Sequence, residues 1–418
     1  MATSSHLLPF WPLAASMVIT MVVQSAFYSY ISLAIFYDFS GTNLFVVSAV
    51  ESVPLIANFI VIFWIGKTAD NQRNHKTLFL VSLGALGIGN VAFLLVYVFF
   101  RNPFVFLCTL FPVSILFGII YMSGPAYVSL IRPAQKGRYM GFLILYQSIG
   151  YFLGGIGGGF LYAWFGIGAI FWVGIILPWV GIFIVIRYLP QTPKTFPITP
   201  RPTCVISTSP GEGVALGESR FHPFENPILK YGLLFDFLLA LGIGIFYKFF
   251  GIFYVQELSG PEEFVGISGG IACLLGALVG FWFGNLADKK SPLIILIYGW
   301  AGYVVVFLGL FLQRDPVAAA IYWAIPIYVE FIGMNKIIAD STSEGNRNRG
   351  LASSTIARNL GSAIGVIAGG ILSFWLTLPE ILAVALILFI PSLICLVLTM
   401  KAYRTKRLVS DSPKPLST

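Results

Sequence analysis

The sequence GKTAD at positions 66–70 returns as GNLAD at 284–288, and each copy follows an apolar segment long enough to cross a bilayer. The first copy opens the polar stretch GKTADNQRNHK, whereas the twenty residues before it contain a single charge, Glu51. The two copies lie 218 positions apart. The same polar loop at equivalent places in an apolar chain predicts two repeats of one membrane-embedded unit.

The composition is that of a membrane protein. Of its 418 residues, 57% are hydrophobic and only 10% are charged, where soluble proteins carry roughly 25% charged residues. A bilayer-spanning helix needs about 20 apolar residues, and lipid offers no partners to open sheet edges. The sequence therefore predicts an all-α polytopic membrane protein with twelve spans as two six-helix bundles, near 11–36, 43–65, 77–100, 104–131, 139–164, 167–188, 228–255, 264–284, 293–313, 316–339, 350–376 and 380–400.

The basic residues predict the orientation. Most of the 25 lysines and arginines fall in alternate loops, and the opposite loops hold only Arg101 and Arg314. Because basic loops stay in the cytoplasm, we expect both termini and the long central loop on the cytoplasmic side. We expect the membrane itself to be the plasma membrane. The net charge of +8 then reflects the basic cytoplasmic loops. We expect the lipid bilayer as a partner and no nucleic acid.

A segment rich in proline, serine and threonine divides the chain. Such a composition cannot bury a core and is typical of an extended linker. We therefore expect four parts: an N-terminal bundle at 1–188, a cytoplasmic linker at 189–226, a C-terminal bundle at 227–401 and a cytoplasmic tail at 402–418.

A second match supports the repeat. KGRYMGFLILYQSIGYFLGGIGGG at 136–159 aligns with RNRGLASSTIARNLGSAIGVIAGG at 347–370, an offset of 211. Small residues four positions apart let helices touch backbone to backbone. The alignment superposes basic residues and glycines in both copies: Arg138, Gly150, Gly154, Gly158 and Gly159 on Arg349, Gly361, Gly365, Gly369 and Gly370.

With these motifs the chain resembles the major facilitator superfamily over nearly its whole length. The family's G-x-x-x-D loop motif is matched by Gly66 with Asp70 and by Gly284 with Asp288. The family usually has a basic residue directly after the aspartate and a glycine two positions further on. At these two places the first copy has Asn71 and Arg73, and the second has Lys289, which fits the pattern, and Ser291, which does not.

The resemblance implies a secondary transporter whose halves rock about a central site, with the two motifs as a cytoplasmic gate. Asp70 would face the helix start near Arg349, and Asp288 the start near Arg138, because a carboxylate is stabilised at a helix N-terminus. Alternatively, these polar residues only mark solvated loops.

The glycines of the fifth span have the spacing of the family's antiporters, except that Gly155 stands where proline is usual. Ordinary helix packing explains them equally well. The fourth span lacks the arginine that is common in proton-driven exporters.

Five ionisable residues lie inside predicted spans: Glu51, Asp236, Lys248, Glu330 and Arg358. Each costs about 2.5–3.5 kcal/mol near the bilayer centre. Burial disfavours a charged carboxylate, so Glu330 and Asp236 are our candidates for binding a coupling proton. In the alternative hypothesis, Glu330 pairs with Arg358 and only braces the bundle.

The other polar candidates are assigned by position. Arg358 aligns with Gln147, which suggests facing positions across a shared cavity. Long cationic side chains commonly extend toward the membrane surface. We expect this of Lys248, with Glu51 as its partner or as a vestibule residue. Gln24, Tyr28 and Tyr247 offer amphipathic contacts for a partly apolar ligand.

These features predict proton-coupled export of a small organic molecule by a monomer. Uptake of an organic anion by proton symport is the alternative that Lys248 and Arg358 motivate, and a ligand-binding sensor that transports nothing is another. The residues suggest no catalytic site, cofactor or metal site.

Overall fold

The computed structural model describes residues 10–39, 43–69, 75–131, 136–189, 223–289, 291–325, 329–342 and 347–411. Within these ranges the side chains at 62–69, 75, 120–126, 128–131, 136–138, 140, 281, 284–285, 287–289, 347–348 and 407–411 are not described.

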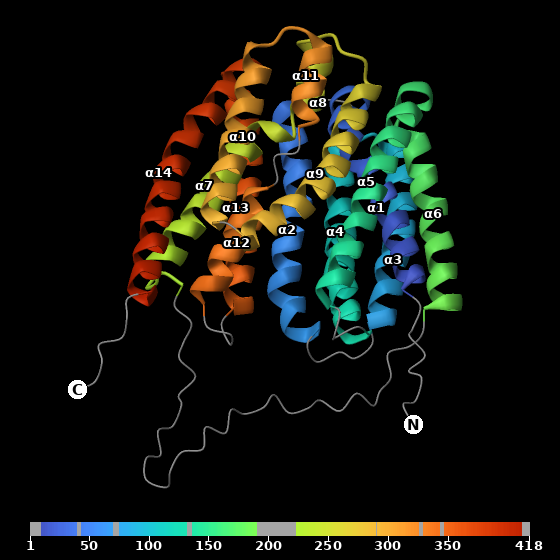
Figure 1. The fold of residues 1–418 in the computed structure, drawn as a ribbon. Helices are drawn as coiled ribbons and strands as arrows, with labels where there is room; N and C mark the ends of the chain where they lie inside the picture. Colours follow the sequence, from blue (N-terminus) through green and yellow to red (C-terminus); the bar gives the residue numbers. More distant parts are fainter. Residues whose placement is uncertain are drawn as a thin grey trace, which may run out of the picture.

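The described residues are almost entirely helical (Figure 1). Their order is α1 (Trp11–Asp38), α2 (Leu44–Ala69), α3 (His75–Leu95) with the π-helical turn η1 (Val96–Phe100), α4 (Pro103–Ile131), α5 (Lys136–Phe165), α6 (Ile167–Tyr188), α7 (Pro227–Tyr247), α8 (Phe250–Gln256), α9 (Glu263–Lys289), α10 (Pro292–Leu312), α11 (Pro316–Trp323), α12 (Glu330–Ser341), α13 (Arg347–Leu372) and α14 (Leu378–Asp411). We call the end where α1 begins and α14 ends the lower end, as drawn in Figure 1, and the opposite end the upper end.

Most of these helices are long and apolar enough to cross a membrane. In the described part of the chain, nine helices meet this criterion. Large apolar side chains are exposed along α6, α10 and α14, as Phe183, Val305 and Ile387 illustrate. Lipid accommodates such surfaces without cost, whereas water does not. The protein is an integral, multi-pass membrane protein.

Two predicted spans contain a local break in the helix, although residues Pro227–Gln256 still form one apolar stretch long enough to cross a membrane. The span expected at 228–255 turns at Lys248 and Phe249, between α7 and α8. The span expected at 316–339 stops after Trp323 and resumes as α12 at Glu330. Pro326 explains the second interruption, because proline lacks the N–H that a helix needs and disfavours a helical residue before it.

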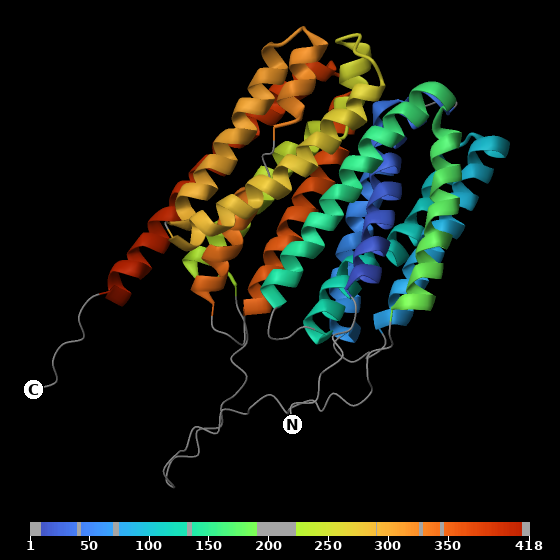
Figure 2. The same cartoon turned by 45° about the vertical axis from the view of Figure 1, so that its right-hand side comes forward.

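The helices form an α1–α6 bundle and an α7–α14 bundle, which lie side by side (Figure 2). Within each bundle one glycine-rich helix lies against the first helix: α5 packs on α1, and α13 packs on α7. The same two helices also make the most extensive contacts between the bundles, α5 with α9 and α13 with α2. The glycine-rich helices are therefore the central elements of both bundles and of their interface.

The glycines explain how closely these helices approach. A Cβ added at Gly154 would lie 2.3 Å from the backbone oxygen of Val22, and one at Gly365 would lie 2.4 Å from that of Leu241. Gly150 and Gly158 make equivalent approaches to α1, as Gly361 and Gly369 do to α7. The helix-packing interpretation of the glycines is therefore confirmed by geometry, and their spacing needs no exporter-specific explanation.

Contacts between the bundles repeat with the offset of the sequence motif. Gly159 of α5 approaches the backbone oxygen of Glu263 in α9, and Gly370 of α13 approaches the backbone of Phe45 in α2. Phe45 and Glu263 lie 218 positions apart, the separation of the two G-x-x-x-D motifs. These close approaches lie at the upper end, where α2 and α9 begin.

Candidate functional site

A cavity of about 460 Å³ lies at mid-height of the α7–α14 bundle. Its charged lining comes from three helices: Asp236 from the middle of α7, Glu330 from the start of α12 and Arg358 from the middle of α13. Leu55 of α2 contributes a wall from the other bundle, and aromatic rings such as Tyr303 line the same space. Lys248, at the turn after α7, lines it as well, so the cavity combines four of the five charged residues that the sequence placed inside the membrane.

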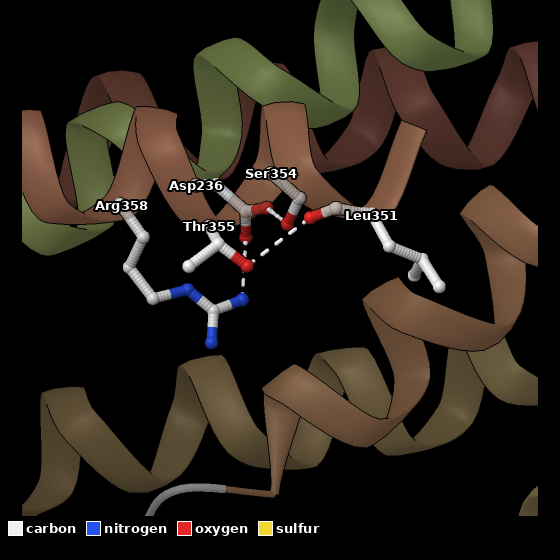
Figure 3. Close-up of polar contacts among 5 residues, drawn as sticks. All are labelled: Asp236, Leu351, Ser354, Thr355 and Arg358. Atoms are coloured by element: carbon white, nitrogen blue, oxygen red, sulfur yellow. Dashed lines mark hydrogen bonds and ion pairs between the residues drawn. The ribbon is translucent and has the colours of Figure 1, made fainter. Parts of the chain in front are cut away.

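Arg358 and Asp236 form an ion pair, with 3.1 Å between Nη2 and Oδ1. The hydroxyl of Ser354, one turn before Arg358 on α13, donates to the other carboxylate oxygen (Figure 3). The guanidinium also lies 5.2 Å from the ring centre of Phe331. Asp236 is buried, so this network supplies the partners that a buried carboxylate requires.

The alternative hypothesis that Glu330 pairs with Arg358 is therefore contradicted. Among the described residues, no ion pair joins these two side chains, and the arginine binds the carboxylate on α7 instead. The physical reason is the course of the chain. The break between α11 and α12 places Glu330 at a helix start, whereas Asp236 lies on α7, the helix on which α13 packs most extensively.

Glu330 is a buried acid with a free oxygen. Its Oε2 atom is buried and has no hydrogen-bond partner. The backbone around it lies tightly on α10, because a Cβ added at Gly299 would be 2.4 Å from the backbone nitrogen of Glu330. A carboxylate in the first turn of a helix is stabilised by the N-terminal end of the helix dipole. This position can hold a negative charge without a dedicated cation.

A second ion pair joins the two bundles. Lys248, at the turn between α7 and α8, lies 2.7 Å from Oε2 of Glu51 on α2. Ser32 of α1 donates to the other oxygen of Glu51 at 2.6 Å, and the ammonium group lies 5.4 Å from the ring centre of Tyr28. The expectation that Lys248 extends toward the membrane surface is wrong, because a buried carboxylate on the facing helix holds it inside.

The charges are nearly balanced. Among the described residues of this region, Lys248 is paired with Glu51, and Arg358 is paired with Asp236. Glu330 is the remaining carboxylate. With Glu330 protonated the five groups sum to zero, and with Glu330 ionised they carry one negative charge. A single acid therefore sets the net charge of the cavity.

The remaining candidates for the cavity separate into two groups. Tyr247 lines the charged cavity together with Lys248. Gln24 and Tyr28 lie on α1, where the hydroxyl of Tyr151 donates to Oε1 of Gln24 at 2.9 Å. Gln147 of α5 contacts the sulfur of Met17, 3.9 Å from its Nε2. Within the described residues, no contact supports its proposed position opposite Arg358.

The cytoplasmic gate lies mostly outside the described residues. Asp70 and Arg73 are not described, and Gly66, Gly284, Asp288, Lys289 and Arg138 occupy helix positions without described side chains. Arg349 is described and exposed at the lower start of α13. The helix order puts both motif copies at the lower end, at the ends of α2 and α9.

Sequence reasoning missed a bond across the upper interface. The backbone N–H of Gly266 in α9 donates to the hydroxyl oxygen of Tyr30 in α1 at 2.8 Å. That hydroxyl lies 3.1 Å from the backbone oxygen of Glu263, to which it can donate. Tyr30 is fully buried and stacks on Tyr162. No local motif distinguishes Tyr30 from the other aromatic residues of α1.

Comparison with known proteins agrees with this fold. The family model described as Major Facilitator Superfamily matches residues 13–335. The structure of the nucleoside transporter NupG superposes with a TM-score of 0.71 at 13% identity, covering 94% of this chain and 98% of that chain. A D-xylose–proton symporter gives 0.65 at 13% identity, with 90% and 95% covered. A bacterial homolog of the human lysosomal transporter Spinster gives 0.65 at 13% identity, with 97% and 98% covered.

No curated protein sequence matches the chain. At the identities found, the structural likenesses concern the fold alone. The family match covers most of the sequence, and the chain therefore belongs to the major facilitator superfamily. It is a secondary transporter of a small molecule in a lipid bilayer, and not an enzyme.

Proposed function

We propose that this transporter exports a small, partly apolar organic molecule in exchange for protons, and that Glu330 carries the proton. The observation that supports this role is the charge balance of the cavity. Both cations already have a carboxylate partner, whereas Glu330 has a buried oxygen without one. Protonation of Glu330 is then the change that alters the net charge of the site.

Exchange follows from competition for one carboxylate. A ligand that hydrogen-bonds to the free oxygen of ionised Glu330 requires the proton to have left, and a returning proton removes that acceptor. Ionised Glu330 also attracts the guanidinium of Arg358, which would weaken the pair with Asp236. Because the three residues come from α12, α13 and α7, such an exchange of partners would change how these helices pack.

The halves at 1–188 and 227–401 would rock about this cavity, joined by the linker at 189–226. The close approaches between bundles at the upper end support a conformation that is closed there. With the lower end in the cytoplasm, as the basic loops indicate, this conformation is closed to the outside. Asp70 and Asp288 would close the lower end in the opposite conformation.

The two alternatives have less support. Uptake of an organic anion needs a cation that is free to bind it, but Lys248 and Arg358 are both occupied by carboxylates. A sensor would bind a ligand and transport nothing, so any flux through the purified protein would exclude it.

Purified protein in liposomes tests the proposal. A panel of radiolabelled cationic, neutral aromatic and anionic solutes is screened for counterflow, and the transported solute is then driven by an imposed pH gradient. We expect Glu330→Gln to retain counterflow and to lose accumulation driven by the gradient. Glu380→Gln is the matched control, because Glu380 is an exposed acid that binds Thr377 at the start of α14. Gradient-driven accumulation by Glu330→Gln equal to that of the control would refute the proposal.

A further inference from the structure

A second cavity, of about 150 Å³, lies between the two bundles. It shares Tyr247 and Lys248 with the charged cavity, so the two spaces meet at this pair of residues. Helices of both bundles line it, through Tyr28 of α1 and Trp323 of α11 among others. We call this space the upper cavity. An occupant would touch both halves of the transporter at once.

We infer that the upper cavity binds a neutral, planar aromatic ring that carries a hydrogen-bond acceptor. This inference rests on the proposed transport function and names the ring-binding part of its substrate site.

The size of the upper cavity suits one ring. An apolar cavity of about 150 Å³ engineered in another protein binds benzene, and the upper cavity has the same volume. A fused or doubly substituted ring system would have to extend into the charged cavity below. The ring-binding part of the ligand is therefore monocyclic.

The aromatic wall is already assembled. Phe250 and Trp323 stack face to face with centroids 3.8 Å apart and planes 4° apart. Tyr247 lies against the same tryptophan at 4.9 Å. Packed aromatic side chains offer faces and edges to a further ring, with a gain of about 0.5–1.5 kcal/mol per pair beyond area burial. A planar aromatic ligand gains from this wall, whereas a saturated ring of similar size does not.

Another part of the lining is polar. Ser25, Ser29 and Ser32 recur along one face of α1 and line the cavity. Lys248 carries three N–H donors, and one of its partners is Glu51. The hydroxyls of Ser25 and Ser32 already donate to the backbone oxygen of Tyr151 and to Glu51. A carbonyl or hydroxyl oxygen on the ligand is the group that the remaining N–H donors of Lys248 recognise.

The ion pair also selects the charge of the ligand. An anion would compete with Glu51 for Lys248 and leave a buried carboxylate unpaired, which is strongly unfavourable. A cation would be repelled by the ammonium group of Lys248. A neutral ligand avoids both costs, so the upper cavity favours an uncharged ring.

Cys273 provides a built-in reporter, because its side chain lines the upper cavity. The probe is benzamide, a neutral planar ring with a carbonyl acceptor, and cyclohexanecarboxamide is its non-aromatic counterpart. Alkylation of Cys273 by N-ethylmaleimide in the purified natural protein is followed by peptide mass spectrometry. Cys108, which is exposed elsewhere on the protein, reports any general change in reactivity. We expect benzamide to slow alkylation of Cys273 several-fold, cyclohexanecarboxamide to have much less effect, and neither compound to protect Cys108.

A cavity-filling variant tests the location. Gly269 lines the upper cavity, and a Cβ added there meets no atom within 4 Å. Gly269→Leu should fold, occupy the space and abolish protection by benzamide. Gly157→Leu is the matched control, because a Cβ at Gly157 also meets nothing within 4 Å and this residue lies outside the cavity lining. Saturation-transfer NMR of benzamide measures binding to both variants independently of Cys273.

Equal protection by the two carboxamides, absence of protection, or benzamide binding retained in Gly269→Leu would overturn the inference. The measurement uses no ion gradient and no variant of Glu330. Failure of benzamide to bind alongside intact gradient-driven transport would refute the ring site alone. Binding of benzamide without gradient-driven transport would refute the coupling alone.

Discussion

Replacing Tyr30 by phenylalanine should open the upper end of the protein. The Tyr30 hydroxyl joins α1 of one bundle to the start of α9 in the other, where it accepts from the N–H of Gly266 at 2.8 Å. Phenylalanine keeps the buried ring and its stacking on Tyr162. The substitution therefore removes a bond between the bundles and leaves the packing within α1–α6 nearly unchanged.

The size of the shift between the two conformations follows from the N–H of Gly266, which loses its hydrogen-bond acceptor. In the conformation closed at the upper end, the N–H of Gly266 would lose its partner while it remains buried, which costs about 1–3 kcal/mol. In the open conformation water satisfies this group. A differential free energy of about 1–3 kcal/mol shifts a two-state equilibrium by roughly 5–150-fold. We expect that shift toward the conformation open at the upper end.

Distances between two spin labels, measured by double electron–electron resonance, report this equilibrium. Phe165 and Arg314 are exposed at the upper end, one in each bundle. Spin labels at these two positions, in a protein whose four cysteines are replaced by alanine, should show a longer-distance population that grows in Tyr30→Phe. Tyr162→Phe is the control, because Tyr162 contributes its ring to the stack and makes no described bond to α9. A distance distribution in Tyr30→Phe that matches wild type would refute the reasoning.

Three further predictions concern packing, charge and pH. Gly154→Leu should abolish folded protein in size-exclusion chromatography, because its Cβ would lie 2.3 Å from a backbone oxygen of α1, while Gly157→Leu, with no atom within 4 Å of its Cβ, should elute normally. Arg358→Met should lower the free energy of unfolding by about 3–5 kcal/mol, because it leaves Asp236 buried without its cation. Adding Asp236→Asn should restore part of that loss in thermal unfolding. A double variant no more stable than Arg358→Met would contradict this. Burial and neighbouring carboxylates raise the pKa of Glu262, which lies in the upper loop before α9. Protonated Glu262 therefore stabilises the conformation closed at the upper end at pH values below the ordinary pKa of glutamate, and this stabilisation is lost as pH rises through the raised pKa. Glu262→Gln should then flatten the pH dependence of the distances between the spin labels. An unchanged pH dependence would contradict this role of Glu262.

The sequence was sufficient for the fold because its signals are local or repeated. Apolar runs of about 20 residues define spans regardless of tertiary structure. The glycines around Gly154 and Gly365 could be aligned because both copies keep the same spacing, and the structure places them on equivalent backbone positions of α1 and α7.

The pairing of the charged residues could not be predicted in the same way. The sequence suggested Glu330 as a partner of Arg358, as one of two hypotheses, only because its span directly precedes that of the arginine. The actual partner, Asp236, lies 122 positions away, and its proximity depends on α13 packing against α7. Lys248 and Glu51 belong to different bundles, so their ion pair depends on the conformation of the whole protein.

The most direct test of proton coupling is the movement of protons that a solute gradient drives. Liposomes that contain the protein and a trapped pH-sensitive dye receive an inward gradient of the transported solute, with no pH gradient applied. For wild type we predict that inward solute flux drives protons outward, so the lumen becomes alkaline. For Glu330→Gln we predict solute flux without a change in luminal pH. Proton movement in Glu330→Gln equal to that in wild type would contradict the role of Glu330, and acidification of the lumen by wild type would contradict exchange.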